Sequence, residues 1–463
     1  MANFLDLIYA LALLGATPYL AWQRFRSGKY RRGWWPKLTG WIPPRSSRLP
    51  CAWLHAVSVG EVLLLRPLLA QLRQHYPHWE LVLTVGTETG YDLARRTFPD
   101  LTVCFAPFDF SWAIRNVFER LRPNLVILVE LELWPNWLRE AQRRQVPVAV
   151  INGRLSQHSY HGYRRLGRWF THHLRCVQLW AVQNATYADR LRRLGVSPAR
   201  IVVTGSLKFD GVATQRHQLR TVELAHLFGL TPPDSADKTE LVWVAGSTQE
   251  PEETLVLQIY ARLHARWPQL RLILVPRHQE RFEHVARLIQ QHGWPLLRRS
   301  SLSLPQPGSS QVPPRPDAIA AAPPPPGEKL HARKPPVILV DTLGELAAVW
   351  GLADVAFVGG SFGNRGGQNM LEPAALGVPV IFGPHVWNFQ EIADELCRAD
   401  AAIQVHSPHE LEAVLVALLA DAPRRQLLGQ RARSFVVAHQ GAVHRTVQAL
   451  HPFFTKAALT DAA

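Results

Sequence analysis

The chain has 463 residues, of which 47% are hydrophobic; this excludes a disordered protein and predicts two or three folded domains. Its formal charge of +15 at pH 7 calls for an anionic partner, which could be nucleic acid, an anionic membrane surface or a phosphorylated substrate. The 4 cysteines are far apart and form no CxxC pair, which argues against a disulfide framework or a zinc site and favours a reducing cytoplasm. The sequence contains 20 histidines but no HExxH motif and no Asp-x-Asp pair, so it predicts no metal site.

The N-terminal segment is apolar enough to attach the protein to a membrane. Residues 4–22 are interrupted only by Asp6 and are about long enough to span a thin bilayer. Basic residues follow this segment and none precedes it, which is the reverse of a secretory signal peptide. By the positive-inside rule, the later domains stay cytoplasmic. We therefore predict a membrane anchor at 1–24 and a basic, aromatic juxtamembrane segment at 25–49.

Two placements of this anchor helix are compatible with the sequence. It is short for a spanning helix and contains Gly15, Thr17 and Pro18, so a helix that lies in the membrane interface competes with one that spans. We call the cationic residues after it the basic flank: Arg24, Arg26, Lys29, Arg31, Arg32 and Lys37, with Trp34, Trp35 and Trp41 among them. Such residues suit the anionic headgroups of a membrane surface.

From about residue 50 onward, short apolar strands alternate with longer helical stretches. The expected strands of the first series are 52–59, 80–86, 103–106, 125–129, 146–151 and 179–183. Those of the second are 241–245, 270–275, 337–340, 355–358, 378–382 and 402–405. Such alternation predicts an α/β fold with two doubly wound Rossmann-like domains, at 50–208 and 239–435. Ligands of such domains bind at the carboxyl ends of the strands, so we expect a substrate cleft between the two sheets.

Three further segments complete the expected organisation. Residues 209–238 contain Pro232-Pro233 and no long apolar strand, and they are expected to link the domains. Residues 301–336 form a tract rich in Pro, Ser and Ala, which is expected to be a disordered surface insertion, with a proline-rich docking site as the alternative. Residues 436–463 are expected to form a C-terminal tail.

The most informative segment is the glycine-rich stretch 359–373. It follows the strand expected at 355–358 and precedes a helical stretch at 371–376, so it joins a strand end to a helix N-terminus. Glycines allow backbone amides to approach an anion, and the helix N-terminus carries partial positive charge. We interpret it as a phosphate cradle with Glu372 as a sugar clamp, and an ordinary glycine turn is the alternative.

Acidic residues follow two strands of the first domain. Glu61 comes just after the strand 52–59 at the start of a helical stretch, where it is either a group that favours the helix dipole or a general base. Glu130 and Glu132 follow the strand 125–129 directly. Carboxylates at the end of a hydrophobic strand are costly unless they are used or paired, which favours a functional role.

Three later strand ends carry groups that suit an anion. Lys208 ends the first domain, although a lone lysine is more often a surface residue. Arg277 follows the strand 270–275 and is suited to bidentate phosphate contact. Residues 341–346 follow the strand 337–340, and their amides could bind an anion, or Asp341 and Thr342 could simply cap a helix.

Taken in order, these segments resemble the family of Kdo transferases, which move 3-deoxy-D-manno-octulosonic acid (Kdo) from its CMP-activated form to a lipid A precursor. The matching motifs are Val59-Gly60-Glu61, Glu-x-Glu-Leu-Trp-Pro-Asn at 130–136, Ser-Leu-Lys-Phe-Asp at 206–210 and Pro-Arg-His at 276–278. They continue with Asp-Thr-Leu-Gly-Glu-Leu at 341–346, the glycine loop at 366–372 and Phe-Gly-Pro-His at 382–385. The resemblance covers nearly the whole chain, apart from the proline-rich insertion, and implies a glycosyltransferase-B arrangement with an N-terminal membrane-anchor helix.

The resemblance also implies roles for individual residues. Glu61 would be the catalytic base, and Glu130 and Lys208 would stabilise the transition state. The positions that would hold the CMP-sugar are Pro276, Arg277, Leu343, Gly344, Glu345, Asn369, Met370, Leu371 and Glu372. Leu343, Gln368 and Met370 replace methionine, histidine and proline of the family pattern, which affects the nucleotide-sugar side and leaves the catalytic residues intact.

The implied reaction is an inverting transfer from CMP-Kdo to a lipid A precursor (lipid IVA) at the cytoplasmic face of a bacterial inner membrane. Glu61 suits the base, while Lys208, Arg277 and the glycine-loop amides suit the departing phosphate, so we expect no cofactor and no metal. The expected partners are the lipid acceptor and an anionic membrane surface, not nucleic acid, because acidic groups among the phosphate contacts oppose polyanion binding.

Two rival interpretations stay open from the sequence. One keeps the glycosyltransferase but changes the donor to another CMP-activated ulosonic acid or another nucleotide sugar, as the altered loop residues allow. The other is a membrane-tethered protein that binds nucleic acid or anionic lipid without catalysis, which leaves the acids at the strand ends unexplained.

Overall fold

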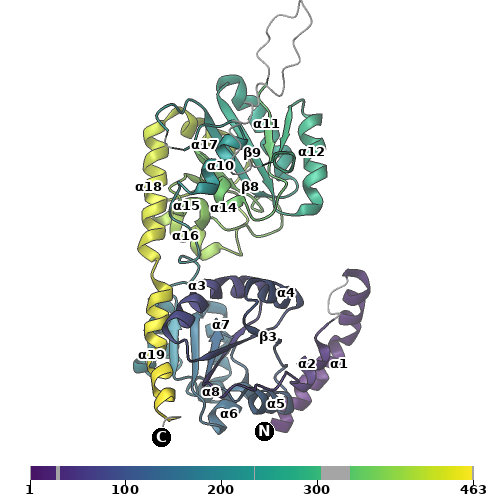
Figure 1. Ribbon diagram of the computed structural model, residues 1–463, viewed down its shortest axis with the longest axis vertical. Helices are drawn as coiled ribbons and strands as arrows, with labels where there is room; N and C mark the ends of the chain where they lie inside the picture. The colour runs from purple at the N-terminus through teal and green to yellow at the C-terminus, as the bar shows by residue number, and fades with distance from the viewer. Residues whose placement is uncertain (1, 28–31, 234, 304–333, 461–463) are drawn as a thin grey trace, which may run out of the picture. The chain divides into compact units, whose positions relative to one another are not determined.

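The computed structural model describes residues 2–27, 32–233, 235–303 and 334–460. The chain divides into two compact units (Figure 1). Unit 1 comprises Met1–Gly211 together with His439–Ala463, and unit 2 comprises Val212–Ala438. Each unit is built on one parallel sheet of seven strands, so the predicted α/β fold with two doubly wound domains is confirmed.

The sheet of unit 1 has the strand order β3-β2-β1-β4-β5-β6-β7. Its strands are β1 (Cys51–Ala56), β2 (Glu80–Val85), β3 (Thr102–Phe105), β4 (Leu125–Val129), β5 (Val148–Gly153), β6 (Leu179–Val182) and β7 (Ile201–Val203). The central strands are buried on both faces, which explains their continuous apolar runs. The order reverses between β1 and β4, so this switch point is where a ligand is expected to bind.

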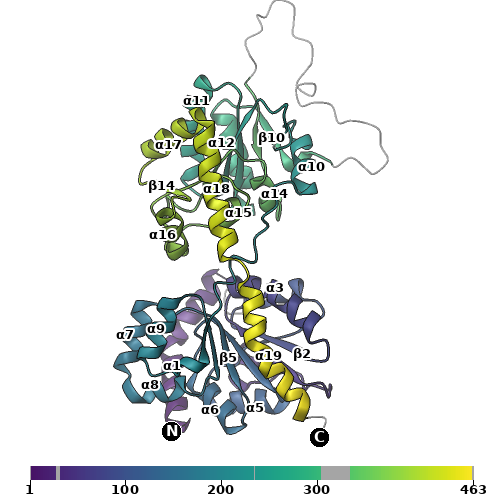
Figure 2. The ribbon, with the colours of Figure 1, turned by 90° about the vertical axis from the view of Figure 1, so that its left-hand side faces the viewer.

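Helices cover both faces of this sheet. They are α3 (Val59–His75), α4 (Glu88–Thr97), α5 (Ser111–Leu121), α6 (Pro135–Arg143), α7 (Gln157–Arg165), α8 (Gly167–Leu174), α9 (Ala185–Arg193) and α19 (Ala442–Thr460), with the short helices α2 (Trp34–Thr39) and η1 (Pro198–Arg200). Helix α19 returns from the end of the chain and lies beside α3 (Figure 2). Its residues Val443, Leu450 and Phe454 are buried in the core of unit 1, so the segment expected to be a tail instead contributes to the core.

The sheet of unit 2 has the order β10-β11-β9-β8-β12-β13-β14. Its strands are β8 (Leu241–Thr248), β9 (Leu270–Pro276), β10 (Leu296–Arg298), β11 (Val337–Leu339), β12 (Val355–Val358), β13 (Val380–Phe382) and β14 (Ile403–Gln404). Its helices are α10 (Leu219–Leu227), α11 (Glu252–Arg266), α12 (Phe282–Gln291), α14 (Leu346–Trp350), α15 (Leu371–Ala375), α16 (Gln390–Arg398), α17 (Pro408–Ala420) and α18 (Ala422–His439), with η2 (Gln279–Arg281) and η3 (Arg299–Ser301). The switch point lies between β8 and β12.

The structure differs from the sequence-based expectation at a few segments. The edge strands β7 and β10 were not expected, and each has only three residues, too few to show a strand pattern. The segment 209–238 expected to be a linker contains helix α10, whose Leu224 is fully buried. The expected insertion 301–336 lies almost entirely outside the described residues.

Helix α1 (Ala2–Ser27) is bound to unit 1 near its N-terminus. The Asp6 carboxylate, 7% exposed, accepts hydrogen bonds from the Ser111 backbone N–H at 2.8 Å and the Ser111 hydroxyl at 2.5 Å. One turn later, the Tyr9 hydroxyl donates to Asp109 at 3.0 Å. Ser111 is the first residue of α5, which has no capping side chain of its own, so Asp6 stabilises that helix N-terminus.

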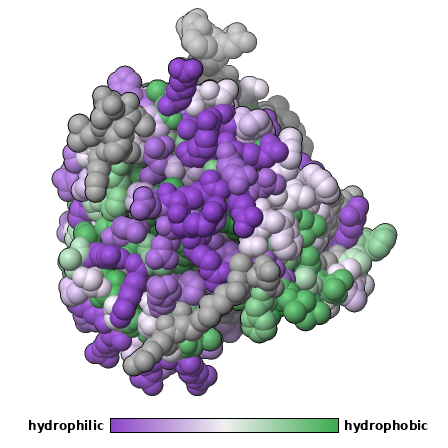
Figure 3. Space-filling view, turned by 90° about the horizontal axis from the view of Figure 1, so that it is seen from below, coloured by the Kyte–Doolittle hydropathy of each residue, from purple (hydrophilic) through white to green (hydrophobic). Residues whose placement is uncertain are grey.

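The other side of α1 is apolar and exposed. Its exposed side chains are Phe4, Leu7, Ile8, Leu11, Leu14, Trp22 and Phe25. Figure 3 shows hydrophobic residues gathered along one side of the face that it draws. Residues Phe4–Arg26 are long and apolar enough to cross a membrane by length and composition. In the basic flank, Arg32 forms ion pairs with Glu88 and Asp92, and Lys29 and Arg31 lie outside the described residues.

Candidate functional site

Glu61 lies at the N-terminus of α3, directly after β1 at the switch point of unit 1. Ser58 is the N-cap of α3, and its hydroxyl donates to Glu61 Oε1 at 2.9 Å. The backbone N–H of Val57 donates to Glu61 Oε2 at 2.7 Å. Both carboxylate oxygens are therefore held, and the side chain, 9% exposed, is fixed at the end of the strand.

Burial raises the pKa of Glu61 to about 7. The hydrogen bonds from Val57 and Ser58 oppose this shift, and the charges of Glu130 and Glu132 add to it. A carboxylate with a pKa near neutrality is a far better proton acceptor than an ordinary glutamate and still ionises at physiological pH. This environment supports the predicted role of a general base.

The ends of β4 and β5 place two further residues near this switch point in an unusual backbone conformation. Glu130, just after β4, has φ 59°, and Asn152, near the end of β5, has φ 51°. Residues other than glycine rarely adopt these left-handed angles, which recur at functional sites where the surrounding structure enforces them. The backbone N–H of Glu130 donates to Ile151 O at 2.9 Å, which joins the two strand ends.

Glu132 is the second acidic residue after β4. Burial raises its pKa, a hydrogen bond from the Trp134 indole at 3.1 Å lowers it, and the charge of Glu130 raises it. Because the charges of Glu130 and Glu132 both act on Glu61, the three acids predicted from two separate strands form one electrostatic group.

Lys208 is held near the same edge of the sheet, although it follows β7. The Asn152 side chain, fully buried, accepts a hydrogen bond from the Leu207 N–H at 3.1 Å, and the Asn152 carbonyl accepts one from Gln183 at 2.9 Å. The chain therefore turns back from β7 to the end of β5 and carries Lys208 with it. Asn152 was not predicted from the sequence, because its role depends on a contact 55 residues away.

In unit 2, the glycine-rich segment after β12 is held by a buried carboxylate. Glu252 is 1% exposed and accepts hydrogen bonds from the N–H groups of Gly360 at 2.7 Å, Ser361 at 2.8 Å and Phe362 at 2.9 Å. It also accepts one from the N–H of Gln249 at 3.0 Å. The prediction that these loop amides cradle a phosphate is therefore wrong for Gly360, Ser361 and Phe362, because a side chain of the protein already occupies them.

Glu372 and Arg277 remain together as a candidate pair for the donor. Glu372 accepts a hydrogen bond from the Asn369 amide at 3.0 Å. Burial raises its pKa, while this hydrogen bond and the charge of Arg277 lower it. Arg277 follows β9, its N–H donates to Thr248 O at 3.0 Å, and its side chain is exposed. An exposed guanidinium near a half-buried carboxylate can contact the phosphate and the sugar of one ligand.

Other predicted donor-site residues have different surroundings. Pro276 is the last residue of β9 and is buried. Met370 and Leu371 are at most 1% exposed, so their side chains are core residues, and their assignment to the donor site stays a prediction. Leu343 is 69% exposed, and Gly344 has φ 85° with open space around it. These two residues form an accessible loop after β11, and their assignment to the donor stays a prediction.

Glu345 is committed to ion pairs within unit 2. Its carboxylate contacts Arg220, and it pairs with Arg299 at 3.1 Å. Burial alone would raise its pKa, but hydrogen bonds from Thr342 and Arg220 and the charge of Arg299 lower it below the usual range. The side chain therefore fixes the loop that bears Leu343, so a ligand contact through its carboxylate would require breaking these pairs.

The described part of the chain contains no cluster of three or more His, Cys, Asp or Glu residues that could hold a metal ion. The role of Glu252 was also not predicted from the sequence. A buried acid at the start of a helix resembles an ordinary helix-dipole residue until its partners, more than 100 residues later, are known.

A family model and two relatives in sequence carry the same family name. A family model described as 3-deoxy-D-manno-octulosonic-acid transferase (kdotransferase) matches residues 29–211. The 3-deoxy-D-manno-octulosonic acid transferase of Haemophilus influenzae is 33% identical over 406 residues, which cover 87% of each chain. The enzyme of the same name from Bordetella pertussis is 33% identical over 459 residues, covering 96% of this chain and 98% of that protein.

A solved structure resembles the fold. The UDP-GlcNAc 2-epimerase from Neisseria meningitidis, bound to UDP-GlcNAc, matches with a TM-score of 0.55 at 12% identity, over 87% of this chain and all of that one. This likeness shows the fold alone, whereas the two bacterial relatives match in sequence along almost their whole length. The family resemblance predicted from the motifs is confirmed: the chain belongs to the 3-deoxy-D-manno-octulosonic acid transferases and is a glycosyltransferase.

Proposed function

We propose that this protein transfers Kdo from CMP-Kdo to a lipid A precursor, with inversion at the anomeric carbon and without a metal. The observation that carries the proposal is Glu61, a buried carboxylate with a pKa of about 7, held by Val57 and Ser58 at the switch point of unit 1. A base takes its proton from the acceptor hydroxyl, so in this proposal unit 1 binds the acceptor. The names of the two bacterial relatives support Kdo as the transferred sugar.

In the proposed reaction, ionised Glu61 removes the proton from the acceptor hydroxyl. The acceptor oxygen forms a bond to the anomeric carbon of Kdo while the bond from that carbon to the CMP phosphate oxygen breaks, and CMP leaves with the electron pair. Glu130 and Lys208 would stabilise the charges that develop, as the family resemblance implies. Arg277 would contact the phosphate, and Glu372 would contact the sugar or ribose hydroxyls.

We further propose that the protein works at the cytoplasmic face of the bacterial inner membrane, with α1 lying in the membrane interface. The buried contacts of Asp6 and Tyr9 bind the first turns of α1 to unit 1, and the apolar side chains on its opposite side are exposed. A helix docked in this way presents one apolar face to the lipids without having to leave the domain.

The test of the base is Glu61→Gln. Glutamine keeps the size of the side chain and an acceptor for the Val57 N–H, but it cannot take a proton. Transfer from CMP-Kdo to lipid IVA should fall at least about a hundredfold, while the affinity for CMP stays unchanged. Mass spectrometry of the lipid product identifies the sugar, the acceptor and the number of sugars added.

The structure supplies a matched control for this substitution. Ser407 caps α17 as Ser58 caps α3, and Glu410 accepts from the His406 N–H at 2.7 Å as Glu61 does from Val57. Glu410→Gln therefore changes the same capping motif in unit 2 and should leave turnover unchanged. Near-normal turnover in Glu61→Gln, or an equal loss in Glu410→Gln, would remove Glu61 from the role of base.

A further inference from the structure

Unit 1 contains an apolar pocket that the reaction described above does not use. Its volume is about 360 Å³, within the range of small-molecule sites. The chain segments after β1, β2, β3 and β4 form one side of it, and Tyr9, Ala12 and Leu13 of α1 form the other. Most of the lining is apolar, with Phe108 and Phe110 among the larger side chains.

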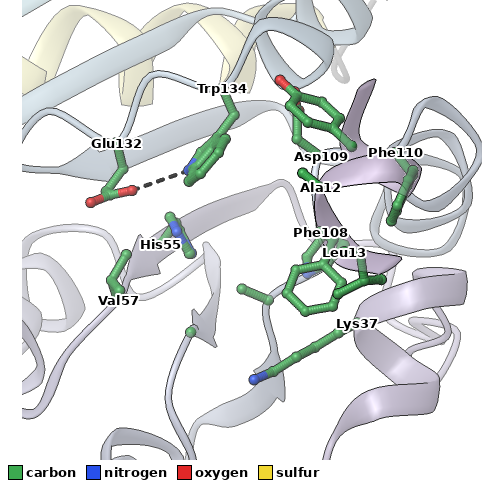
Figure 4. A pocket seen from close by; sticks show the side chains of 14 residues that line it. Ala12, Leu13, Lys37, His55, Val57, Phe108, Asp109, Phe110, Glu132 and Trp134 are labelled. Atoms are coloured by element: carbon green, nitrogen blue, oxygen red, sulfur yellow. Dashed lines mark hydrogen bonds between the residues drawn. The ribbon is translucent and has the colours of Figure 1, made fainter. Parts of the chain in front are cut away.

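The two ends of this pocket differ in character (Figure 4). Val57 and Glu132 lie at one end, and Leu13, Phe108 and Phe110 lie at the other, beside α1. The Val57 N–H is bonded to Glu61, so the first end adjoins the proposed base. The second end is bordered by the helix whose outer face is exposed and apolar. The pocket thus connects the catalytic edge of unit 1 with its membrane-facing helix.

One cation lines the pocket. The Lys37 side chain is partly buried, and its ammonium lies 5.4 Å from the Phe105 ring centroid and 5.9 Å from that of Phe108. No hydrogen bond or salt bridge to this ammonium is present among the described residues, and Glu88 acts on it only from a longer distance. Partial burial of an ammonium is costly, the two ring contacts offset that cost only in part, and an anionic group of a ligand would offset more of it.

We propose that this pocket holds one acyl chain of the lipid acceptor, with an anionic group of the same molecule against the Lys37 ammonium. The inference rests on the proposed function, since it names the part of the acceptor that unit 1 recognises. The apolar lining favours a hydrocarbon chain, the Lys37 ammonium favours a phosphate, and the position beside α1 lets the chain enter from the membrane. The acceptor hydroxyl would then face Glu61 at the other end.

The first test fills the pocket. Ala12→Phe adds a ring to a side chain that lines the pocket, and Leu11→Phe changes the neighbouring residue, which is 59% exposed, as the matched control. The readout is the ratio of kcat/KM for an acylated acceptor to that for the deacylated acceptor. Ala12→Phe should lower this ratio about tenfold, the factor that accompanies loss of burial of two methylene groups, and Leu11→Phe should leave it unchanged.

The second test removes the cation and needs no turnover. Binding of a 14-carbon alkyl phosphate, below its micelle concentration, is measured by calorimetry on the full chain. Lys37→Met keeps the apolar stem and should weaken binding about tenfold, Lys37→Arg should restore most of it, and the uncharged 14-carbon alcohol should bind equally to all three proteins. Ala12→Phe should weaken both ligands.

These results separate the pocket from the reaction. If the filled pocket leaves the acceptor ratio unchanged, or if the alkyl phosphate binds equally to the wild type, Ala12→Phe and Lys37→Met, the acyl site is refuted even though Kdo transfer continues. If the alkyl phosphate binds as expected but no protein transfers Kdo to either acceptor, the proposed function fails and the lipid site stands. Equal affinity for an unrelated phospholipid and the acceptor would show a general lipid site and would also refute the proposal.

Discussion

The hydroxyl of Ser58 provides a quantitative test of how the structure tunes Glu61. It donates to Glu61 Oε1 at 2.9 Å and lowers the pKa that burial raises to about 7. A hydrogen bond to a charged group contributes about 1.5–3 kcal/mol, which corresponds to roughly 1–2 pKa units. In Ser58→Ala, the pKa of Glu61 should therefore rise from about 7 to roughly 8–9.

The consequence is a shift in the pH dependence of transfer. The base must be ionised to act, so kcat/KM for the acceptor falls as the pH drops below the pKa of Glu61 in the donor-bound enzyme. Near pH 7, the ionised fraction should decrease from about one half to between about one tenth and one hundredth, and activity should fall by the same factor. Above about pH 9.5, the variant should recover most of the wild-type rate. The assay is kcat/KM for Kdo transfer from pH 5.5 to 10 at saturating CMP-Kdo.

A purely structural role for Ser58 predicts a different profile. Ser58 caps α3, so its loss should also destabilise the protein by about 1 kcal/mol, as should Ser407→Ala at the equivalent cap of α17. Ser407→Ala should leave the acid limb of the pH profile unchanged, and Ser58→Thr should restore it. An unshifted limb in Ser58→Ala, or a loss that is the same at every pH, would refute the account of how Glu61 is tuned.

Three further expectations follow from the contacts in the structure. Arg277→Ala should weaken CMP binding roughly tenfold or more by calorimetry, and Arg277→Lys should recover little of it, because an ammonium does not reproduce a bidentate fork; full recovery would contradict that contact. Glu252→Gln should lower the free energy of unfolding by about 2–4 kcal/mol in chemical denaturation, because it disturbs four backbone hydrogen bonds. The control Glu412→Gln removes an exposed ion pair and should lower it by less than about 1 kcal/mol. Burial raises the pKa of Asp109 to about 7, so its protonated form favours folding below about pH 4, and this stabilisation is lost as the pH rises towards 7. Asp109→Asn should therefore gain stability relative to the wild type over that range. Parallel plots of unfolding free energy against pH for the two proteins would contradict this expectation.

Much of this fold could be predicted from the sequence because parallel strands buried on both faces leave a clear signal. The runs that became β4 and β12 are apolar throughout, those of β1 and β8 contain only His55 and the terminal Ser247 and Thr248 as polar residues, and helical stretches separate them. The failures have equally physical reasons. Strands β7 and β10 pair at sheet edges over only three residues, and α19 showed no sign that it would return to the core of unit 1.

The candidate site, like the fold, could be predicted only in part from the sequence. Residues at strand ends could be read from the sequence, so Glu61, Glu130 and Arg277 were found. Residues that act by holding a distant loop could not be, which is why Asn152 and Glu252 were missed. The misreading of the glycine loop has the same origin: its amides do bind a carboxylate, but that carboxylate is Glu252 of the same unit rather than a ligand.

Glu61 and Glu410 share a helix-start motif but differ in their surroundings. Both glutamates occupy the third position of a capped helix, both are preceded by a capping serine, and both accept a 2.7 Å hydrogen bond from the backbone N–H before that serine. The capping motif is therefore an ordinary stabilising feature of a helix start and does not by itself point to a base. What distinguishes Glu61 is its burial at the point where the strand order reverses, with two acids from β4 beside it. The proposed role of base therefore depends on Glu130 and Glu132, which lie some 70 residues further along the chain, and not on the helix-start motif alone.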